Sequence, residues 1–419
     1  MRQLVKPIPK ATLQEIFKEE LRSDDSAGSV VRDFEVLLDF ISTEGMTVSG
    51  QYHLLPLRRL PDLNTRLTRP IQLDLKRPQQ ISYPSINGLY LLARASGLVY
   101  IDQTGSKPTI HLDLPALQSW TGLNPIEKYF TLLESWLIRG NPEILGERSS
   151  LGWMTRRIHS WASLFEQIPP EGRPIAGDTR AEASLRYTPG PYNLALLELF
   201  GLMVIQHLPP EPGGGWRVGR LYRTPLGEAV LYLLVEHYEQ DFDYFRDPTE
   251  ADFVPGRLQP IFQRYVPQWQ NNLAFPEIGF REGQFVFKVS LGRAWRRIAV
   301  PAAFTLDELR LAILKAFDFA DPEHLYTFKY PNRFGSLMEV HHPESDEGPY
   351  THEVRVGDIS LRLEATMIFL FDYIDNWEFE VQLERIEPAD PQISQAVVLE
   401  SQGRAPAQYD WVEDEEDEP

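Results

Sequence analysis

Apolar residues recur with helical spacing through most of the first 240 residues. A clear set is Val30, Phe34, Leu37, Leu38 and Ile41. Its members are three or four positions apart, so they share one face of a helix. Similar spacing predicts helices near 13–21, 84–96, 125–138, 193–200 and 225–234, and others from about 115 and 153. Residues 169–191 are rich in proline, glycine and charge, and we expect a loop or linker there.

Two parts of this helical region repeat one order of elements: helix, glycine, strand, loop, strand, helix. In the first part Gly97 follows the helix, and strands are expected at 98–101 and 109–112. In the second part Gly201 follows the helix, and strands are expected at 202–207 and 216–222. This order is typical of a winged helix, in which a hairpin wing follows the recognition helix. We therefore expect residues 1–275 to be mainly helical, with winged-helix-like units whose wings lie near 98–112 and 202–222.

The pattern changes after residue 281. Residues 285–291 alternate apolar and polar, which predicts a half-buried strand, and a second strand is expected at 295–300. Thr305 and Glu308 form a capping-box pair that opens an amphipathic helix. Further strands are expected at 325–330, 337–341, 367–373 and 378–386. Residues 281–390 are thus predicted to form an α+β domain, with one helix packed on a mostly antiparallel sheet.

Four stretches of this domain carry the motifs of a known family. They read AWRRIAVP at 294–301, TLDEL at 305–309, HLYTF at 324–328 and FDYIDNWE at 371–378. With these motifs residues 285–388 resemble the plasmid pRiA Orf-three-like domain family, whose longer members often have a helical, winged-helix-like segment before the domain. The motif positions present here are Trp295, Arg296, Arg297, His324, Asp372, Asp375, Trp377 and Glu378.

This chain departs from the late motif of the family at three positions. Ile374 and Asn376 stand where the family usually has glycine, and Phe379 stands where it usually has histidine. The resemblance therefore implies the fold, but it implies no metal or catalytic role through that histidine and no particular reaction.

Charge is distributed unevenly along the 419 residues. The chain has 41 Lys and Arg against 60 Asp and Glu, a formal net charge of −19 that excludes nucleic-acid binding by bulk positive charge. Residues 1–300 are neutral as a group, so residues 301–419 hold the whole negative excess. The end of the chain, 405–419, is strongly acidic, and we expect this tail to be disordered.

One local segment is basic. The basic stretch, residues 58–77, contains only two acids and the following six cationic residues: Arg58, Arg59, Arg66, Arg69, Lys76 and Arg77. A cationic patch beside a winged helix is a footprint expected for DNA contact. The alternative is an ordinary solvated arginine face that pairs with the acidic C-terminal half. Aromatic residues do not interleave with these charges, which argues against a stacking platform for single strands.

Few residues point to catalysis. The chain has no cysteine, which excludes disulfides, thiol catalysis and cysteine-bound metals. Asp372, Asp375 and Glu378 carry oxygen ligands of the kind that divalent cations prefer. On a regular strand, however, Asp372 and Asp375 face opposite sides, so a turn with solvated carboxylates is the alternative. We assign no catalytic residue, metal ligand or cofactor.

Three functions remain open. The leading hypothesis is an intracellular binding or adaptor protein, with DNA or a protein as its partner, that contacts nucleic acid through the winged-helix-like units. The alternatives are a metal-dependent hydrolase built on the late carboxylates and a purely protein–protein interaction module. An enzyme is the less favoured class, and no small-molecule substrate is indicated. No signal peptide and no apolar run of about 20 residues is found, so we expect a cytoplasmic protein without a membrane partner.

Overall fold

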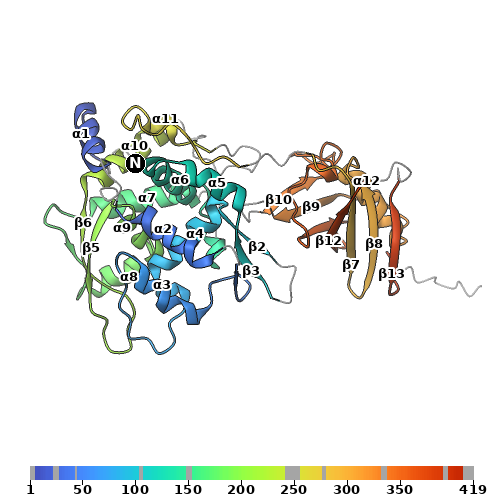
Figure 1. Cartoon of the computed structure of the whole chain (residues 1–419), viewed down its shortest axis with the longest axis horizontal. Helices are drawn as coiled ribbons and strands as arrows, with labels where there is room; N and C mark the ends of the chain where they lie inside the picture. Colours follow the sequence, from blue (N-terminus) through green and yellow to red (C-terminus); the bar gives the residue numbers. More distant parts are fainter. Residues whose placement is uncertain are drawn as a thin grey trace, which may run out of the picture. The chain divides into compact units, whose positions relative to one another are not determined.

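The computed structural model describes residues 5–21, 28–42, 45–102, 107–147, 153–240, 255–275, 280–331, 337–389 and 395–408. The chain divides into two compact units (Figure 1). The first unit is Met1–Ile101 with Lys107–Pro276, and the second is Asp102–Ser106 with Glu277–Pro419. Each has its own hydrophobic core. Among the described residues, no helix is both long enough and apolar enough to cross a membrane.

The first unit is mainly helical. Its helices are α1 (Lys10–Glu20), α2 (Val30–Ile41), α3 (Leu60–Arg66), α4 (Pro84–Ser96), α5 (Leu114–Gly122), α6 (Pro125–Glu134), α7 (Trp153–Glu166), α8 (Thr179–Tyr187), α9 (Pro191–Leu199), α10 (Pro225–Gln240) and α11 (Gln259–Phe262). Shorter helical turns are η1 (Leu57–Arg59), η2 (Gln80–Ser82), η3 (Ser135–Arg139) and η4 (Pro142–Leu145).

Two small antiparallel sheets complete the first unit. One has the order β1 (Met46–Thr47), β3 (Thr109–Leu112), β2 (Val99–Asp102). The other has the order β4 (Arg173–Pro174), β6 (Arg217–Arg223), β5 (Met203–Leu208). Each expected hairpin is therefore present, and a third short strand joins it.

Helices α4 and α9 pack against each other in the centre of the first unit. A Cβ atom at Gly88 would lie only 2.7 Å from Cγ of Leu196, so glycine at this position permits the close approach of the two helices. Every residue of α4 except Arg94 is buried, and most of α9 is buried as well.

This burial matters for the winged-helix hypothesis. The expected order of elements is present twice, as α4–β2–β3–α5 and as α9–β5–β6–α10. However, α4 and α9 are the two helices that would have to enter a DNA groove, and both are covered by other parts of the unit. Neither helix is thus available as a recognition helix, and the winged-helix assignment stays a prediction about the order of elements.

One expectation for the first unit is wrong. Residues 169–191 are not only a loop, because they contain β4 and α8. The Asp178 side chain caps α8 by accepting hydrogen bonds from the backbone N–H groups of Arg180 and Ala181, both at 3.0 Å. The helix expected at 125–138 is present: it is α-helical as α6 and continues without a break as the π-helical turn η3.

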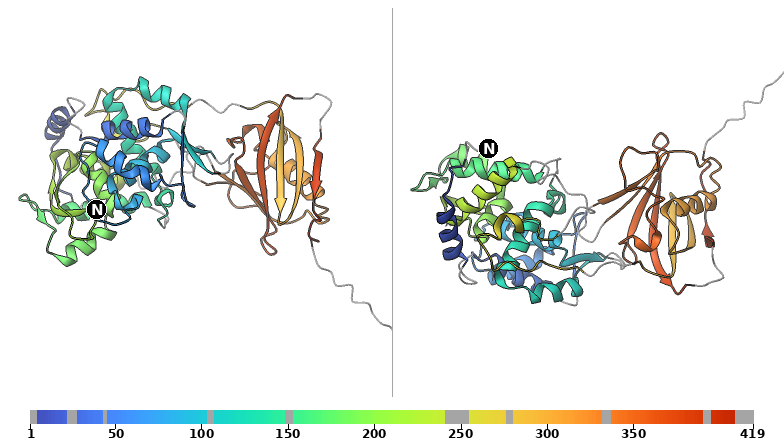
Figure 2. Two further views of the ribbon diagram at one scale, coloured as in Figure 1. Left: turned by 60° about the horizontal axis from the view of Figure 1, so that its bottom comes forward. Right: turned by 90° about the horizontal axis from the view of Figure 1, so that it is seen from above.

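The second unit is a seven-stranded sheet in the order β10–β9–β11–β12–β7–β8–β13, with every neighbouring pair antiparallel. The strands are β7 (Gln284–Leu291), β8 (Ala294–Pro301), β9 (Tyr326–Pro331), β10 (Leu337–His341), β11 (Thr366–Phe371), β12 (Trp377–Glu387) and β13 (Val397–Gln402). Helix α12 (Leu306–Ala316) lies across one face of the sheet (Figure 2). Thr305 and Glu308 form the expected capping box. The predicted α+β class is therefore confirmed.

Strand β13 lies beyond residue 390, where we expected the domain to end. It pairs with β8 at the edge of the sheet, and a bulge interrupts the pairing between Val398 and Glu400. All six of its residues are exposed, so it lacks the alternating pattern that identifies a half-buried strand. Residues 409–419, which make up most of the acidic tail, lie outside the described residues, so their expected disorder stays a prediction.

Candidate functional site

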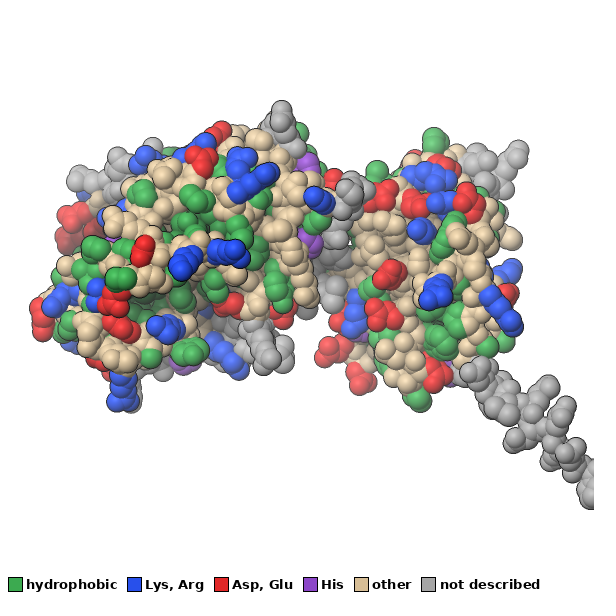
Figure 3. Space-filling view, turned by 90° about the horizontal axis from the view of Figure 1, so that it is seen from below, with side chains coloured by type: hydrophobic (Ala, Val, Ile, Leu, Met, Phe, Trp, Pro, Cys, Tyr) green, Lys and Arg blue, Asp and Glu red, His purple; other side chains and the backbone are tan. Residues whose placement is uncertain are grey.

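All six cationic residues of the basic stretch are exposed. Arg58 and Arg59 lie in η1, directly before α3, and Arg66 ends α3. The other three follow in the extended chain that leads to η2. Figure 3 views the molecule from below, the side on which α3 lies in Figure 1, and Lys and Arg side chains are distributed over this face of the first unit.

Acidic partners separate these six residues into two groups. Arg66 pairs with Asp62 at 3.1 Å, and Arg69 pairs with Glu198 at 2.8 Å. The other four have no acidic partner among the described residues: Arg58, Arg59, Lys76 and Arg77. The Arg59 guanidinium lies 4.6 Å from the centre of the Phe40 ring, which holds it in place without neutralising its charge.

The chain at 71–77 runs beside the loop that joins β5 to β6. The Asp74 carboxylate accepts a hydrogen bond from the Gly213 backbone N–H at 2.8 Å, and the Asp74 backbone N–H donates to the Gly214 carbonyl at 3.0 Å. Lys76 and Arg77 therefore lie close to this hairpin.

The arginines of the hairpin itself are already engaged. Arg217 pairs with Glu211 and Arg223 pairs with Glu228, both at 2.8 Å. Arg220 donates to the carbonyl of Gly172 at 3.0 Å. Unlike Arg58, Arg59, Lys76 and Arg77, the hairpin arginines are thus held by ion pairs or by carbonyl hydrogen bonds.

A chain of hydrogen bonds links Arg69 to the hairpin through Glu198, whose side chain is only 9% exposed. Glu198 contacts Arg69 with one oxygen and Nε2 of His207 with the other, each at 2.8 Å. Nδ1 of His207 lies 3.2 Å from Nε1 of Trp216. Because an indole N–H only donates, Nδ1 of His207 accepts, which assigns the imidazole proton to Nε2. The orientation of Trp216 is therefore fixed.

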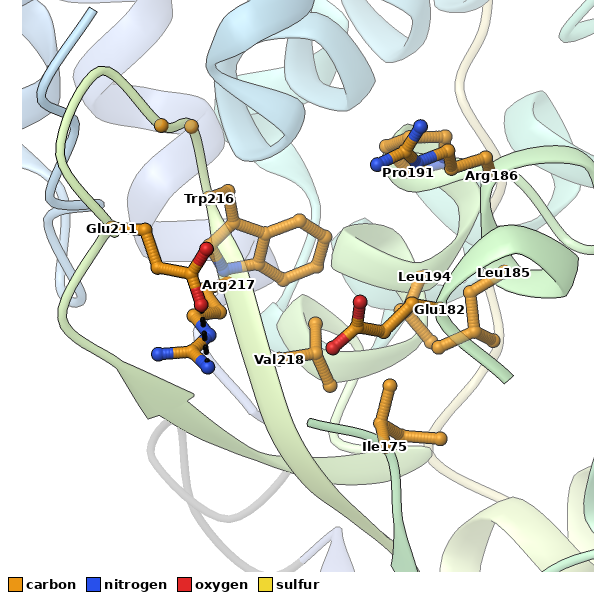
Figure 4. Close-up of a pocket in the computed structure, with 12 residues that line it drawn as sticks. Ile175, Glu182, Leu185, Arg186, Pro191, Leu194, Glu211, Trp216, Arg217 and Val218 are labelled. Atoms are coloured by element: carbon orange, nitrogen blue, oxygen red, sulfur yellow. Dashed lines mark ion pairs between the residues drawn. The ribbon is translucent and has the colours of Figure 1, made fainter. Parts of the chain in front are cut away.

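Trp216 forms part of the wall of a pocket with a volume of about 260 Å³ (Figure 4). The pocket lies between α8, the start of α9 and the β5–β6 hairpin. Its lining residues are Ile175, Glu182, Leu185, Arg186, Pro191, Leu194, Glu211, Gly214, Gly215, Trp216, Arg217 and Val218.

The Arg296–Arg297 motif has structural partners. Buried Arg296 donates to four carbonyls, those of Ala316, Trp295, Gln402 and Gly403, at 2.9–3.2 Å. Arg297 donates to both oxygens of Glu384 at 2.6 and 2.9 Å and also contacts Glu400. Its hydrogen bonds hold the pKa of Glu384 below the usual value. These arginines therefore join β8 to α12, β12 and β13.

Trp295 and His324 also have partners within the second unit. Nε1 of Trp295 donates to the Gln402 side chain at 2.9 Å. The His324 ring lies between two carboxylates, with Nδ1 3.2 Å from Asp372 and Nε2 3.2 Å from Asp321. The first four motif positions therefore all contact other residues of the second unit: Trp295, Arg296, Arg297 and His324.

The late motif forms a tight turn between β11 and β12. Asp372 has a positive φ of 57°, and its carboxylate accepts a hydrogen bond from the Ile374 backbone N–H at 2.9 Å. Trp377 packs edge-on against Phe319, with 5.2 Å between ring centres. The motif residues at both ends of the turn thus stabilise it.

The late carboxylates do not converge. Asp372 is buried in the turn, whereas Asp375 and Glu378 are exposed. Across the described ranges, no group of three His, Asp or Glu side chains is arranged to hold a metal ion. The carboxylate cluster of the hydrolase alternative is therefore not formed, because the Asp372 carboxylate is buried in the turn and accepts the Ile374 hydrogen bond there.

The sequence did not indicate Glu198, His207 or Trp216. Each is nine residues from the next. His207 and Trp216 meet because β5 and β6 pair, and Glu198 reaches His207 from the end of α9. The register of this hairpin was the one available signal, since it brings residues near 207 opposite residues near 217.

Comparison with known proteins identifies only the second unit. Residues 285–409 match the family model described as plasmid pRiA4b ORF-3-like protein, which confirms the resemblance of this segment. A crystal structure of a protein of unknown function, MM3350 from Methanosarcina mazei Go1, is 27% identical. That match covers 30% of this chain and 74% of the other, with a TM-score of 0.28. No curated protein matches the chain.

Proposed function

We propose that the chain is a cytoplasmic, non-catalytic binding protein whose first unit contacts the phosphate backbone of duplex DNA through the basic stretch. The observation that carries this proposal is the open charge of Arg58, Arg59, Lys76 and Arg77, which are exposed and have no acidic partner among the described residues. Cationic side chains in this state neutralise phosphates and release their counterions, which is the main source of sequence-independent affinity.

The burial of α4 and α9 determines whether the protein contacts bases or phosphates. Base readout in the major groove needs an exposed helix or strand pair, and α4 and α9 are both covered. Contacts from the basic stretch reach phosphates, which position a protein on the duplex without reading its sequence. We therefore expect binding with little sequence preference.

The net charge of −19 does not oppose this function at short range. At physiological salt the Debye length is about 8 Å, so distant acidic residues are screened from a phosphate in contact with the basic stretch. The local charge of residues 51–100, which is +5, determines the interaction there.

Binding to a labelled duplex, measured by fluorescence anisotropy with the full chain at low salt, tests the proposal. Replacing Arg58, Arg59, Lys76 and Arg77 together by alanine should weaken binding at least about ten-fold. The matched control replaces four exposed cations of α1 and its surroundings and of the chain after α11: Lys6, Lys10, Lys18 and Arg264.

Helices α1 and α11 lie at the end of the first unit opposite α3 (Figure 1). The control variant removes the same amount of charge, so it should bind nearly as well as the unchanged chain. No binding at low salt, or equal losses in both variants, would contradict the proposal.

A further inference from the structure

The pocket beside Trp216 is lined by both apolar and charged side chains and includes none of the four open cations of the basic stretch. Leu185 of α8, Leu194 of α9 and Val218 of β6 line it together with the Trp216 ring. The bond from Trp216 to His207 fixes this ring before any ligand enters. Such a preformed wall lowers the entropic cost of binding a flat or branched apolar group.

Two charges in the pocket neutralise each other and two do not. Glu211 and Arg217 form an ion pair at 2.8 Å. Glu182 and Arg186 are four residues apart on α8, a spacing that favours an ion pair, but they form none. Oε1 of Glu182 accepts a hydrogen bond from the Gly177 backbone N–H at 3.1 Å, and no acidic partner of Arg186 is found among the described residues.

The two open charges lie in different parts of the pocket. Glu182 extends from α8 toward Trp216 and Val218, whereas Arg186 lies near Pro191 (Figure 4). One carboxylate and one guanidinium are thus presented one turn apart on α8, beside the apolar side chains of Leu185, Leu194 and Trp216. A ligand that satisfies both must carry a positive and a negative group joined by a short link.

The volume limits the size of this ligand. Sites for drug-sized molecules and cofactors span about 300–1,000 Å³, and this pocket measures about 260 Å³. A nucleotide also requires more than one open cation for its phosphates. A purely apolar molecule would cover the Glu182 carboxylate without giving it a partner, which is unfavourable.

We propose that the pocket binds a free amino acid with an aromatic or large aliphatic side chain. The ammonium group pairs with Glu182, the carboxylate pairs with Arg186, and the side chain packs against Trp216 and Leu194. This site does not depend on the proposed DNA contact, because it uses none of the four open cations of the basic stretch.

Isothermal titration of the full chain tests the proposal with three probes. L-phenylalanine carries both charges, phenethylamine carries only the ammonium group, and 3-phenylpropionate carries only the carboxylate. We expect L-phenylalanine to bind at least about ten-fold more tightly than either analogue. No binding of L-phenylalanine up to about 10 mM, or equal binding of the three probes, would overturn the proposal.

Two variants assign the charges. Glu182→Gln and Arg186→Gln should each weaken L-phenylalanine binding about ten-fold or more. Glu182→Gln should leave 3-phenylpropionate binding almost unchanged, and Arg186→Gln should do the same for phenethylamine. The control Arg180→Gln removes an exposed charge of α8 that does not line the pocket, so it should bind like the unchanged chain.

Binding of L-phenylalanine that persists in both pocket variants would overturn the assignment. Thermal unfolding of each variant shows whether it folds. If either variant does not fold, the comparison of the three probes on the unchanged chain decides the question alone.

Discussion

Two sets of cationic residues, one in each unit, differ in what surrounds them. In the first unit Arg58, Arg59, Lys76 and Arg77 are exposed and have no acidic partner in the described parts of the chain. In the second unit Arg296 is buried against four carbonyls, and Arg297 lies between Glu384 and Glu400. Cationic side chains are thus exposed to solvent in the first set, whereas in the second set they join β8 to the neighbouring strands and to α12.

This difference separates stability from binding. Arg296 and Arg297 belong to a family motif, yet carbonyls and carboxylates of the second unit already accept their hydrogen bonds. The basic stretch belongs to no recognised motif, yet its charges remain open. Replacing Arg296 or Arg297 should therefore lower stability, and replacing the open cations of the basic stretch should lower affinity for a polyanion.

Arg296→Met should give the largest loss of stability. It leaves the carbonyls of Gln402 and Gly403 without this donor while keeping most of the side-chain volume, and we expect a cost of about 2–4 kcal/mol in the free energy of unfolding. Urea denaturation measures it. Arg293→Met replaces a nearby exposed arginine and should change stability little. Equal effects of the two substitutions would remove the contrast between buried and exposed cations.

Arg297→Gln should have a smaller and pH-dependent effect. Arg297 lowers the pKa of Glu384 below its ordinary value of 4.5, so the pair stabilises the fold fully above that pH. Its contribution is lost as the pH falls through the lowered pKa. We expect a cost of about 1–2 kcal/mol near pH 7 that shrinks below pH 4.5.

Unfolding free energies of the unchanged chain and of Arg297→Gln, measured between about pH 7 and pH 3, give this profile. A difference that stays constant over the whole range would show that the ion pair with Glu384 is not its source.

Arg69 is exposed like the other cations of the basic stretch but ion-paired like Arg297. Replacing it should lower the free energy of unfolding less than Arg297→Gln does. Its side chain is 59% exposed, but its partner Glu198 is nearly buried and is also held by His207. We expect Arg69→Ala to cost about 0.5 kcal/mol, because solvent screens the exposed side of the pair. A thermal unfolding midpoint lowered as much as in Arg296→Met would place Arg69 with the structural arginines.

The combined replacement of Arg58, Arg59, Lys76 and Arg77 by alanine should have the smallest effect on stability. Exposed side chains without acidic partners contribute little, so we expect a change within about 0.5 kcal/mol. Circular dichroism during urea denaturation checks this value. A loss of several kcal/mol would mean that the basic stretch holds the fold together.

Local signals predicted the elements whose causes are local. The Thr305–Glu308 capping box and the alternation at 285–291 identified a helix and a strand. Helix α8 was missed because it buries only Ala181 and Leu185 and sits in a segment rich in proline and glycine.

Long-range features could not be predicted in this way. Glu198 and Arg69 are 129 residues apart in sequence, and only the packing of the 58–77 segment beside α9 brings them together. The sequence left open whether Asp372, Asp375 and Glu378 converge; they do not, because Asp372 adopts a positive φ in a turn, which a regular strand pattern does not foresee.

The salt dependence of DNA binding tests the central claim most directly. The logarithm of the association constant falls linearly with the logarithm of salt concentration, with a slope of about −0.9 for each phosphate contacted. If all four open cations contact phosphates, the combined alanine variant should lose up to about 3.6 units of slope. The control variant at Lys6, Lys10, Lys18 and Arg264 should keep the slope of the unchanged chain. An unchanged slope in the basic-stretch variant would contradict the account.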